Sequence, residues 1–343
     1  MSNHRFDWKW NLSEIRPDKD IKVFTTFSCG GGSSMGYKRA GFQVIGNVEI
    51  DPKINAMYVK NHHPKFNYSM DLRKFNEKED LPEELYHLDI LDGSPPCSTF
   101  STAGQREKNW GKAKAFREGQ AKQVLDDLFF VFLDTVEKLQ PKVVIAENVM
   151  GLIKGNAKGY VNLIIKRFKE IGYDVQMFAL NAARMDVPQA RNRVFFIANR
   201  MGYPKLSLDF KYDPILFGEV RTPDGIPYPE HTVIGQLAKR IRRGDKELRD
   251  VAMRTAGEAA ANLYFTHKII ADEEVCCTVT SAGNITRLYD KKLFTDRDYA
   301  NCQTFPQDYD YNGNDVHYVC GMSVPPNMMA NIATEVYEQW LKK

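Results

Sequence analysis

The sequence predicts an α/β fold with a doubly wound, mostly parallel sheet and a second, smaller domain. Short apolar, β-rich runs alternate with helix-like stretches over the first two hundred residues, as in βαβ units. A glycine-rich turn, Gly30-Gly31-Gly32, separates the first run from the first helix, and open α/β sheets bind ligands at such turns. At about 150 residues per domain, the 343 residues suffice for two compact domains.

The predicted elements alternate along the chain. Apolar runs that end in turn residues indicate strands, and apolar positions at helical spacing indicate helices. We expect strands over residues 21–27, 42–48, 87–91, 143–146, 175–180 and 193–198, and helices from the glycine turn to residue 40, over 119–139 and over 160–171.

The character of the sequence changes after Asn199. Residues 203–230 contain five prolines and little periodicity, which favours a domain boundary near residue 200. A last helix begins at Pro325-Pro326, and its apolar stripe indicates packing against the first domain. We therefore expect one domain over residues 1–199, completed by residues 316–343, and a second over residues 200–315.

The composition excludes several classes of protein. Apolar residues make up 43% and charged residues 27%, which argues against a mainly disordered chain. The longest apolar run, residues 128–133, is far too short to span a membrane, and the N-terminus lacks a signal-peptide core. The six cysteines contain no CxxC pair and no zinc-ligand spacing. We therefore expect a soluble cytoplasmic protein with reduced thiols and no metal.

Two segments are locally basic. Residues 101–122 hold six Lys or Arg against two Glu, and residues 236–255 hold seven against three acids. A charge cluster is usually only a solvated face. Two such patches on a chain with a net charge of +3 nevertheless suggest a polyanionic partner.

The glycine turn and Glu49 are compatible with an adenosine-type cofactor. Glu49 ends the second expected strand, eighteen residues after Gly31, about where an acid binds ribose hydroxyls in nucleotide folds. The segment is not GxGxxG, so an ordinary glycine turn explains it about as well. The sequence has no GxxxxGK[ST] segment, which excludes a P-loop.

Cys97 follows the expected end of a strand, in the segment Gly-Ser-Pro-Pro-Cys-Ser-Thr-Phe-Ser. A lone cysteine is usually a small core residue. Here two prolines stiffen the loop, and small polar residues and a basic segment follow it. This context favours a presented, reactive thiol.

Two further segments provide a carboxylate and arginines. Glu147 follows a strand expected beside that of Cys97, and Arg191 and Arg193 open a later strand on one face. Taken singly, these residues fit a helix start and a surface pair. Together with the thiol, they place a nucleophile, an acid and a cation at successive strand ends, which predicts an active site.

In this combination the sequence resembles the DNA cytosine carbon-5 methyltransferases of the bacterial and phage type, over nearly its whole length. The matching motifs, in the order of the family, are the cofactor loop at residues 26–32, the ribose acid Glu49, the adenine-side acid Asp71, Pro96-Cys97, Glu147-Asn148-Val149, the QxRxR motif at residues 189–193, Thr295 with Arg297 and Phe305-Pro306, and residues 321–324 before the last helix. The resemblance implies a Rossmann-like catalytic domain and a target-recognition domain after residue 200.

The resemblance also implies the role of each catalytic residue. Cys97 adds to carbon 6 of cytosine, which makes carbon 5 nucleophilic. Glu147 supplies a proton or strong hydrogen bond at N3, and Arg193, with Arg191 in the same motif, holds the base O2. S-adenosylmethionine donates the methyl group and becomes S-adenosylhomocysteine. The expected cofactor-binding residues are Phe27, Ser28, Cys29, Gly31, Gly32, Glu49, Ile50, Asp71, Leu72, Ser323 and Val324.

The sequence departs from the family pattern around the cofactor. The family usually has Asp at about Thr25, Gly at Cys29, Gln at Ser98 and Asn at Met322, and often a Trp at Ile50. The expected nucleophile, acid and arginine are all present.

The implied substrate is double-stranded DNA, with the target base flipped out of the helix. We expect DNA contacts from Arg106 and Lys112 in the first basic segment, and from Arg240, Arg242 and Arg243 in the second. The resemblance implies a monomeric, nucleoid-associated enzyme of a bacterium or phage, with a restriction endonuclease as a functional partner.

Alternatives remain open at this point. An RNA (tRNA) cytosine-5 methyltransferase would share the same catalytic residues and differ after residue 200. A catalytically silent DNA-binding module would not need Cys97, Glu147 and Arg193. An amino-group methyltransferase fits less well, because its [DNS]PP[YF] motif has an aromatic residue where Cys97 stands.

Overall fold

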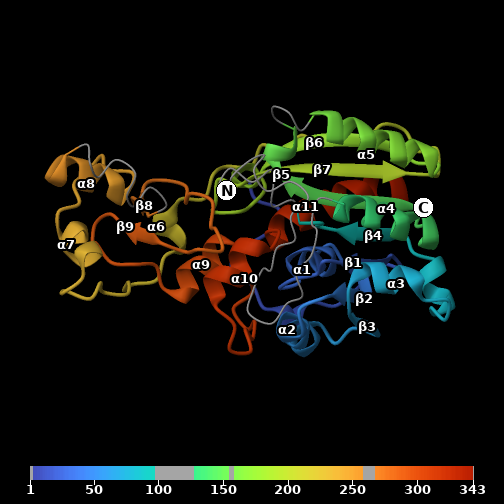
Figure 1. Cartoon of the computed structure of the whole chain (residues 1–343), viewed down its shortest axis with the longest axis horizontal. Coiled ribbons are helices and arrows are strands. Elements are labelled where there is room, and N and C mark those ends of the chain that lie inside the picture. The colour runs from blue at the N-terminus through green and yellow to red at the C-terminus, as the bar shows by residue number, and fades with distance from the viewer. Residues whose placement is uncertain (1–2, 97–126, 154–157, 258–266, 343) are drawn as a thin grey trace.

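A computed structural model describes residues 3–96, 127–153, 158–257 and 267–342 (Figure 1). Its centre is a seven-stranded sheet of order β3-β2-β1-β4-β5-β7-β6. Neighbours from β3 to β5 are parallel, whereas β7 runs antiparallel to both β5 and β6. The predicted α/β fold with a mostly parallel sheet is therefore confirmed.

The elements of the sheet region include all the predicted strands and helices, together with three between residues 52 and 77 that were not predicted. They are β1 (Lys22–Thr26), α1 (Gly32–Arg39), β2 (Gln43–Glu49), α2 (Pro52–His62), β3 (Phe66–Ser69), α3 (Leu72–Glu77), β4 (Ile90–Gly93), α4 (Leu128–Leu139), β5 (Val143–Val149), α5 (Lys158–Glu170), β6 (Asp174–Asn181), β7 (Asn192–Asn199) and, from the end of the chain, α11 (Pro326–Val336).

Two hydrophobic clusters sandwich the sheet. Alternate strand residues such as Val23 and Ile145 pack with α1 and α11 on one face, and their neighbours Phe24 and Val144 pack with α3, α4 and α5 on the other. This burial on both faces explains why the central strands are continuous apolar runs rather than alternating ones.

Two element boundaries differ clearly from the prediction. β4 begins at Ile90, because His87 ends a short 3₁₀ turn instead. β5 continues to Val149, because β7 pairs with it beyond the end of β4. Glu147 therefore lies within the strand rather than after it. α4 begins at Leu128, and residues 119–126 of the expected helix lie outside the described residues.

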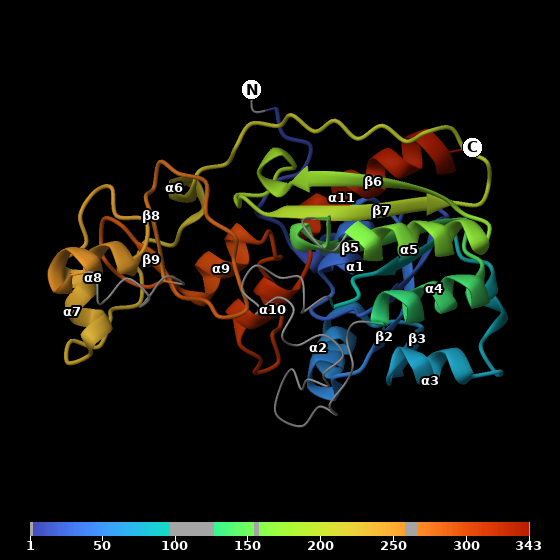
Figure 2. The same ribbon diagram turned by 45° about the horizontal axis from the view of Figure 1, so that its top comes forward.

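The chain does not leave the sheet region at residue 199. In Figure 2 the segment after β7 runs along the sheet before it crosses to α6. Tyr203 stacks on Trp340 with ring centroids 5.8 Å apart, and Leu206 is buried in the α1 and α11 cluster. Packing therefore extends the sheet region by roughly ten residues beyond Asn199.

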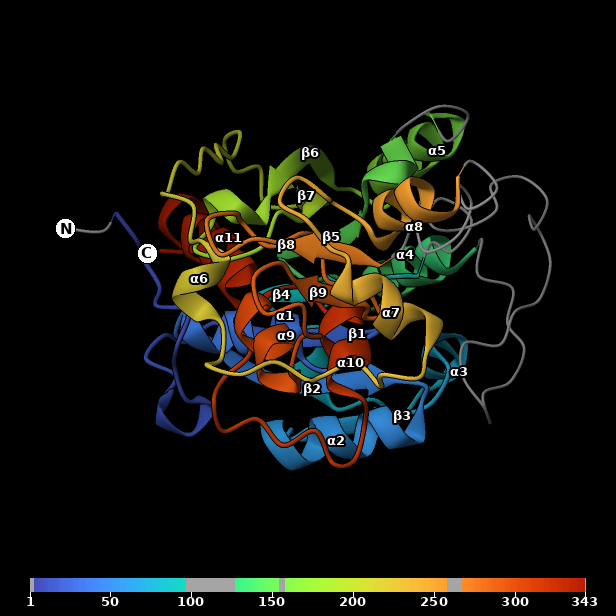
Figure 3. The same ribbon diagram turned by 90° about the vertical axis from the view of Figure 1, so that its left-hand side faces the viewer.

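The outer region contains α6 (Phe217–Val220), α7 (Val233–Lys239), α8 (Leu248–Ala256), β8 (Lys268–Ile270), β9 (Ile285–Arg287), α9 (Asp296–Cys302) and α10 (Val316–Met322). Figure 3 shows this region in front of the sheet. Its distal part has a small core of its own around Leu237 and Val251. Its inner part shares a core with Met35 and Ile54 of the sheet region. No helix among the described residues is long and apolar enough to cross a membrane.

Candidate active site

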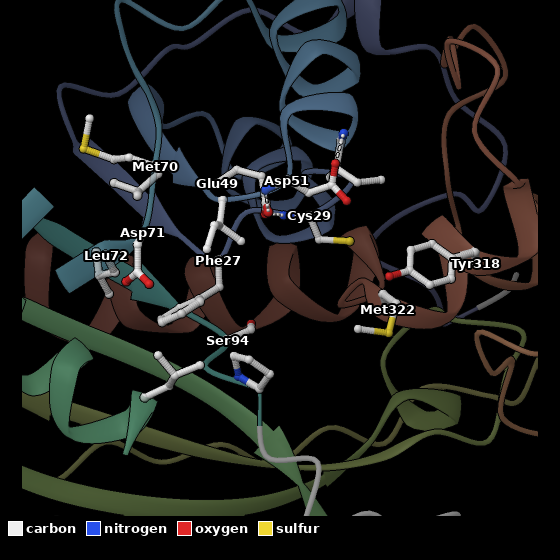
Figure 4. Close-up of a pocket in the computed structure, with 15 residues that line it drawn as sticks. Phe27, Cys29, Glu49, Asp51, Met70, Asp71, Leu72, Ser94, Tyr318 and Met322 are labelled. Atoms are coloured by element: carbon white, nitrogen blue, oxygen red, sulfur yellow. Dashed lines mark hydrogen bonds between the residues drawn. The ribbon is translucent and has the colours of Figure 1, made fainter. Parts of the chain in front are cut away.

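A pocket opens at the carboxyl ends of β1 to β4 (Figure 4), where open α/β sheets bind ligands. Each strand end and α10 contribute to its walls. The lining residues are Phe27, Cys29, Val48, Glu49, Ile50, Asp51, Ile54, Met70, Asp71, Leu72, Ser94, Pro96, Leu128, Tyr318 and Met322. We call this the first pocket, and it contains six of the residues expected to bind the cofactor.

Glu49 is held in the first pocket by the backbone. Its carboxylate accepts hydrogen bonds from the N–H of Cys29 (2.8 Å) and of Asp51 (2.9 Å). The side chain is buried, and burial raises its pKa. These bonds leave lone pairs on both oxygens, so the carboxylate can still accept the two hydroxyls of a ribose.

The glycine turn packs directly against the segment before α11. Gly31 has a φ of +72°, which other residues rarely adopt, and a Cβ there would collide with the buried His62 ring. A Cβ on Gly32 would collide with the backbone carbonyl of Val324. Only glycine allows this close approach. It brings the predicted cofactor residues of the glycine turn next to Val324, which was predicted to bind the cofactor from the C-terminal part of the sequence.

Asp71 and Leu72 lie at the far wall of the first pocket. Asp71 caps α3 by accepting the N–H of Arg73 (2.8 Å), and it also pairs with the Arg73 guanidinium (3.3 Å). Leu72 is buried in the core and presents an apolar surface to the pocket. The Asp71 carboxylate is thus oriented by its helix before any ligand binds.

Glu147 and Arg193 form an ion pair across β5 and β7. The Arg193 Nε lies 2.8 Å from Glu147 Oε1, and the two side chains are only 15% and 11% exposed. Arg193 is opposite Val149 in the register, two residues from Glu147, so the side chains point to the same face. The predicted carboxylate and arginine therefore meet.

Asn148 connects this pair to the loop that precedes Cys97. Its side-chain N–H donates to the carbonyl of Pro95 (3.1 Å), and its oxygen accepts the N–H of Val149. No separate role was predicted for Asn148, although it is the central residue of the Glu-Asn-Val segment. Cys97 itself lies outside the described residues, as do Arg106 and Lys112.

Four of the five described cysteines are poor nucleophiles. Burial raises the pKa of Cys29 and Cys320 to about 12. The pKa of Cys276 is raised chiefly by burial, and that of Cys277 chiefly by its hydrogen bond to Cys276. At neutral pH these four thiols stay protonated.

Arg191 is close to the ion pair but takes no part in it. It is buried, and its guanidinium donates to the carbonyls of Val279 (3.0 Å) and Gly321 (2.9 Å). Burial lowers its pKa to about 9. Expected as a catalytic residue, Arg191 joins the start of β7 to the outer region and to α10, which makes it a positioning residue.

Gln189 makes a similar connection to α9. It is fully buried, donates to the carbonyl of Cys302 (3.2 Å) and accepts the N–H of Val279 (2.9 Å). Thr295 caps α9, and Arg297 donates to the carbonyl of Gln307 (3.0 Å). The motif around α9 thus supports the active-site wall without lining the pocket.

The predicted DNA-contact residues of the outer region are exposed. Arg240, Arg242 and Arg243 follow α7, and we call residues 240–243 the outer basic turn. Arg243 approaches Glu273 (3.5 Å). Within the described residues, the guanidinium groups of Arg240 and Arg242 form no ion pair. Their guanidinium groups are therefore accessible to a ligand that approaches from solvent.

A search of residues 3–96, 127–153, 158–257 and 267–342 finds no group of three His, Cys, Asp or Glu side chains that could hold a metal ion.

Comparison with known proteins gives consistent matches. The sequence model described as C-5 cytosine-specific DNA methylase matches residues 21–338. The type II methyltransferase M.NgoPII of Neisseria gonorrhoeae is 28% identical, over 92% of this chain and 95% of its own. The type II methyltransferase M.Sau96I of Staphylococcus aureus is 27% identical, over 95% of this chain and 78% of its own.

Solved structures show the same fold. A DNA modification methyltransferase encoded within an E. coli prophage has a TM-score of 0.66 at 20% identity, over 94% of this chain and 100% of that one. A DNMT2 variant of Spodoptera frugiperda has a TM-score of 0.63 at 17% identity, over 93% of this chain and 100% of that one.

Proposed function

This chain belongs to the C-5 cytosine-specific DNA methylase family, and we propose that Cys97, Glu147 and Arg193 carry its reaction. The chain is a DNA (cytosine-5-)-methyltransferase that depends on S-adenosylmethionine. The observation that supports the proposed residues is the buried Glu147–Arg193 ion pair, which Asn148 links to the loop before Cys97.

The proposed chemistry begins with the Cys97 thiolate. Its sulfur forms a bond to carbon 6 of a flipped-out cytosine, and the displaced electron pair moves through the ring toward N3. Glu147 exchanges its ion pair with Arg193 for a proton taken up from solvent, and it delivers this proton to N3. Arg193 then donates hydrogen bonds to O2, so the ring carries little charge. In the free enzyme each of these two groups compensates the charge of the other.

Bound S-adenosylmethionine supplies the methyl group to carbon 5. A base then removes the carbon-5 proton, the electron pair restores the double bond between carbons 5 and 6, and the Cys97 thiolate leaves. Because Glu147 is buried and Arg193 is only 15% exposed, their interactions with the base take place in a region of reduced dielectric.

Residues of the first pocket fit an adenosine-containing cofactor. The Glu49 carboxylate, held by two N–H groups, faces the pocket beside apolar Phe27 and Leu72. The buried Ser323 hydroxyl has no hydrogen-bond partner among the described residues. Its polar neighbour is the Cys29 thiol. We propose that Glu49 binds the ribose, that Asp71 and Ile50 contact the adenine, and that Ser323 and Val324 flank the remainder.

The outer region is proposed to recognise the DNA sequence. Exposed arginines of the outer basic turn can bind phosphates or read guanines, and Arg106 and Lys112 would add phosphate contacts. One chain carries both the catalytic pair and the basic turn, which supports a monomeric enzyme that works on DNA in the nucleoid. Because M.NgoPII and M.Sau96I are named type II methyltransferases, we propose a companion restriction endonuclease.

The function is tested with radiolabelled S-adenosylmethionine and two substrates, duplex DNA and bulk tRNA. We expect label in DNA alone, and methylation-sensitive sequencing of DNA from expressing cells should find 5-methylcytosine in one sequence context. Label in tRNA with none in DNA would favour the RNA methyltransferase and overturn the proposal.

A further inference from the structure

A second, smaller pocket adjoins the first at the N-terminal end of α1. The two share Phe27, Cys29, Ser94 and Met322, which Figure 4 labels among the residues of the first pocket. The remaining lining residues of the second pocket are Thr25, Ser28, Gly32, Ser33, Ser34, Asp92, Ser323 and Val324. The feature that the proposed function does not use is the carboxylate of Asp92.

Asp92 is buried, with 2% of its surface exposed. Its carboxylate accepts the Tyr37 hydroxyl (3.0 Å) and a hydrogen bond from Ser33. Within the described residues it forms no ion pair with a Lys, Arg or His, and the charge that acts on it is that of Glu147, which has the same sign. Burial raises its pKa to about 8. Without a cation the group therefore stays mostly protonated at neutral pH, and a cationic ligand would stabilise its ionised form.

The opposite side of the second pocket suits an anion. Gly32, Ser33 and Ser34 form the first turn of α1, an eight-residue helix whose N-cap Gly31 has no capping side chain. The N–H groups of a first helical turn have no partner within the helix and attract negative charge. The buried Ser323 hydroxyl lines the same space.

The second pocket therefore presents a buried carboxyl group, which a cation would ionise, and a helix N-terminus to the same ligand. A zwitterion with an ammonium and a carboxylate on one carbon matches both. S-adenosylmethionine carries such an α-amino acid group beyond its adenosine, and the second pocket continues from the pocket proposed for the adenosine.

We propose that Asp92 binds the α-ammonium group of S-adenosylmethionine. This inference rests on the proposed function of the first pocket. Asp92 lies in β4, opposite Thr25 in the register, and five residues before Cys97. Binding of the ammonium group at this point would also fix the strand end from which the nucleophile loop begins.

The test measures binding by calorimetry rather than activity. S-adenosylhomocysteine has the ammonium group, whereas 5′-methylthioadenosine has the same nucleoside and thioether without the amino acid. Asp92→Asn should bind S-adenosylhomocysteine about 10- to 100-fold more weakly, the range for a hydrogen bond between charged groups. Its affinity for 5′-methylthioadenosine should not change.

Two variants control for structural effects. Tyr37→Phe removes the hydrogen bond that the Asp92 side chain accepts from the Tyr37 hydroxyl but leaves the carboxyl group, so it should retain the preference for S-adenosylhomocysteine. Glu49→Gln should lower the affinity for S-adenosylhomocysteine and for 5′-methylthioadenosine by the same factor, because both ligands contain the ribose. If Asp92→Asn does not fold, the deaminated analogue of S-adenosylhomocysteine tests the wild-type protein, which should bind it at least 10-fold more weakly, by the same estimate.

If Asp92→Asn lost affinity for both ligands by the same factor, or kept its affinity for both, the assignment of Asp92 would be overturned. Equal affinity of the wild type for S-adenosylhomocysteine and its deaminated analogue would do the same. A wild-type protein that binds none of these ligands would instead show that the proposed cofactor site is wrong, and the inference would fail with it.

Discussion

The charges at the carboxyl edge of the sheet differ sharply from those of the outer basic turn. Glu147 and Arg193 are 11% and 15% exposed and lie 2.8 Å apart, whereas Arg243 is 84% exposed and 3.5 Å from its nearest acid. Buried, oriented charges act strongly on a reacting group. Exposed charges attract a polyanion but are screened by salt. The first arrangement suits chemistry, and the second suits reversible binding to DNA.

This contrast predicts different consequences for substitutions in the two regions. At the sheet edge a single substitution should strongly reduce the methyl-transfer rate or the free energy of unfolding, with little dependence on salt. In the outer basic turn a change should alter DNA binding by a smaller factor that disappears at high salt.

The largest effect is expected for Glu147→Gln. Glutamine keeps the shape of the side chain and one hydrogen bond, but it cannot deliver a proton to N3. We expect the methyl-transfer rate at saturating substrates to fall by about 10²- to 10⁴-fold, the usual range for general acid catalysis. Single-turnover kinetics measure this rate, and calorimetry with S-adenosylhomocysteine should show unchanged affinity.

The same pair of measurements can contradict the assignment of Glu147. A parallel loss of rate and of S-adenosylhomocysteine affinity would place this residue in the cofactor site. Unchanged rate would exclude it as the acid.

Arg191→Met tests whether the buried arginine beside the pair is a supporting residue. The variant leaves the carbonyls of Val279 and Gly321 without their donor, and each unsatisfied buried group costs about 1–3 kcal/mol. We expect the free energy of unfolding in denaturant to fall by about 2–4 kcal/mol. The control Arg242→Met, at an exposed position, should change it by less than about 0.5 kcal/mol. Equal stability of the two variants would refute the structural role of Arg191.

The smallest effect is expected for the double variant Arg242→Ala and Arg243→Ala. If both arginines bind phosphates, the slope of log affinity for DNA against log salt should decrease by about 2, roughly 0.9 for each contact. If they read guanines, discrimination among DNA sites should decrease while non-specific affinity remains.

The control for this variant removes two exposed cations of the sheet region, Lys166 and Lys169 of α5, and should leave the slope unchanged. No change in either slope or discrimination after substitution of the arginines would mean that the outer basic turn is only a solvated surface.

Local patterns predicted most of the sheet region. Buried parallel strands are short apolar runs with turn residues after them, so β1, β5 and β7 could be located from the sequence to within a few residues. The sequence also predicted an acid and an arginine at successive strand ends, but not that Glu147 and Arg193 form an ion pair.

The missed features depend on contacts between distant segments. The length of β5 depends on pairing with β7, fifty residues later. Arg191 was expected at the reaction centre, because strand alternation does not show that the carbonyls of Val279 and Gly321 lie within its reach. Asp92 received no role, since its burial beside Tyr37 becomes visible only when α1 packs over β4.

The central claim is that Cys97 forms a covalent bond to carbon 6 of the target cytosine. In DNA that carries 5-fluorocytosine, fluorine cannot leave as a cation, so the final elimination is blocked. The account predicts a denaturant-resistant adduct of protein and DNA that forms only with S-adenosylmethionine. The adduct should be absent in Cys97→Ser, because a serine hydroxyl is hardly ionised at neutral pH, and it should persist in Cys302→Ser, which changes a buried cysteine. An adduct that survives the loss of Cys97, or an active enzyme that never forms one, would contradict the account.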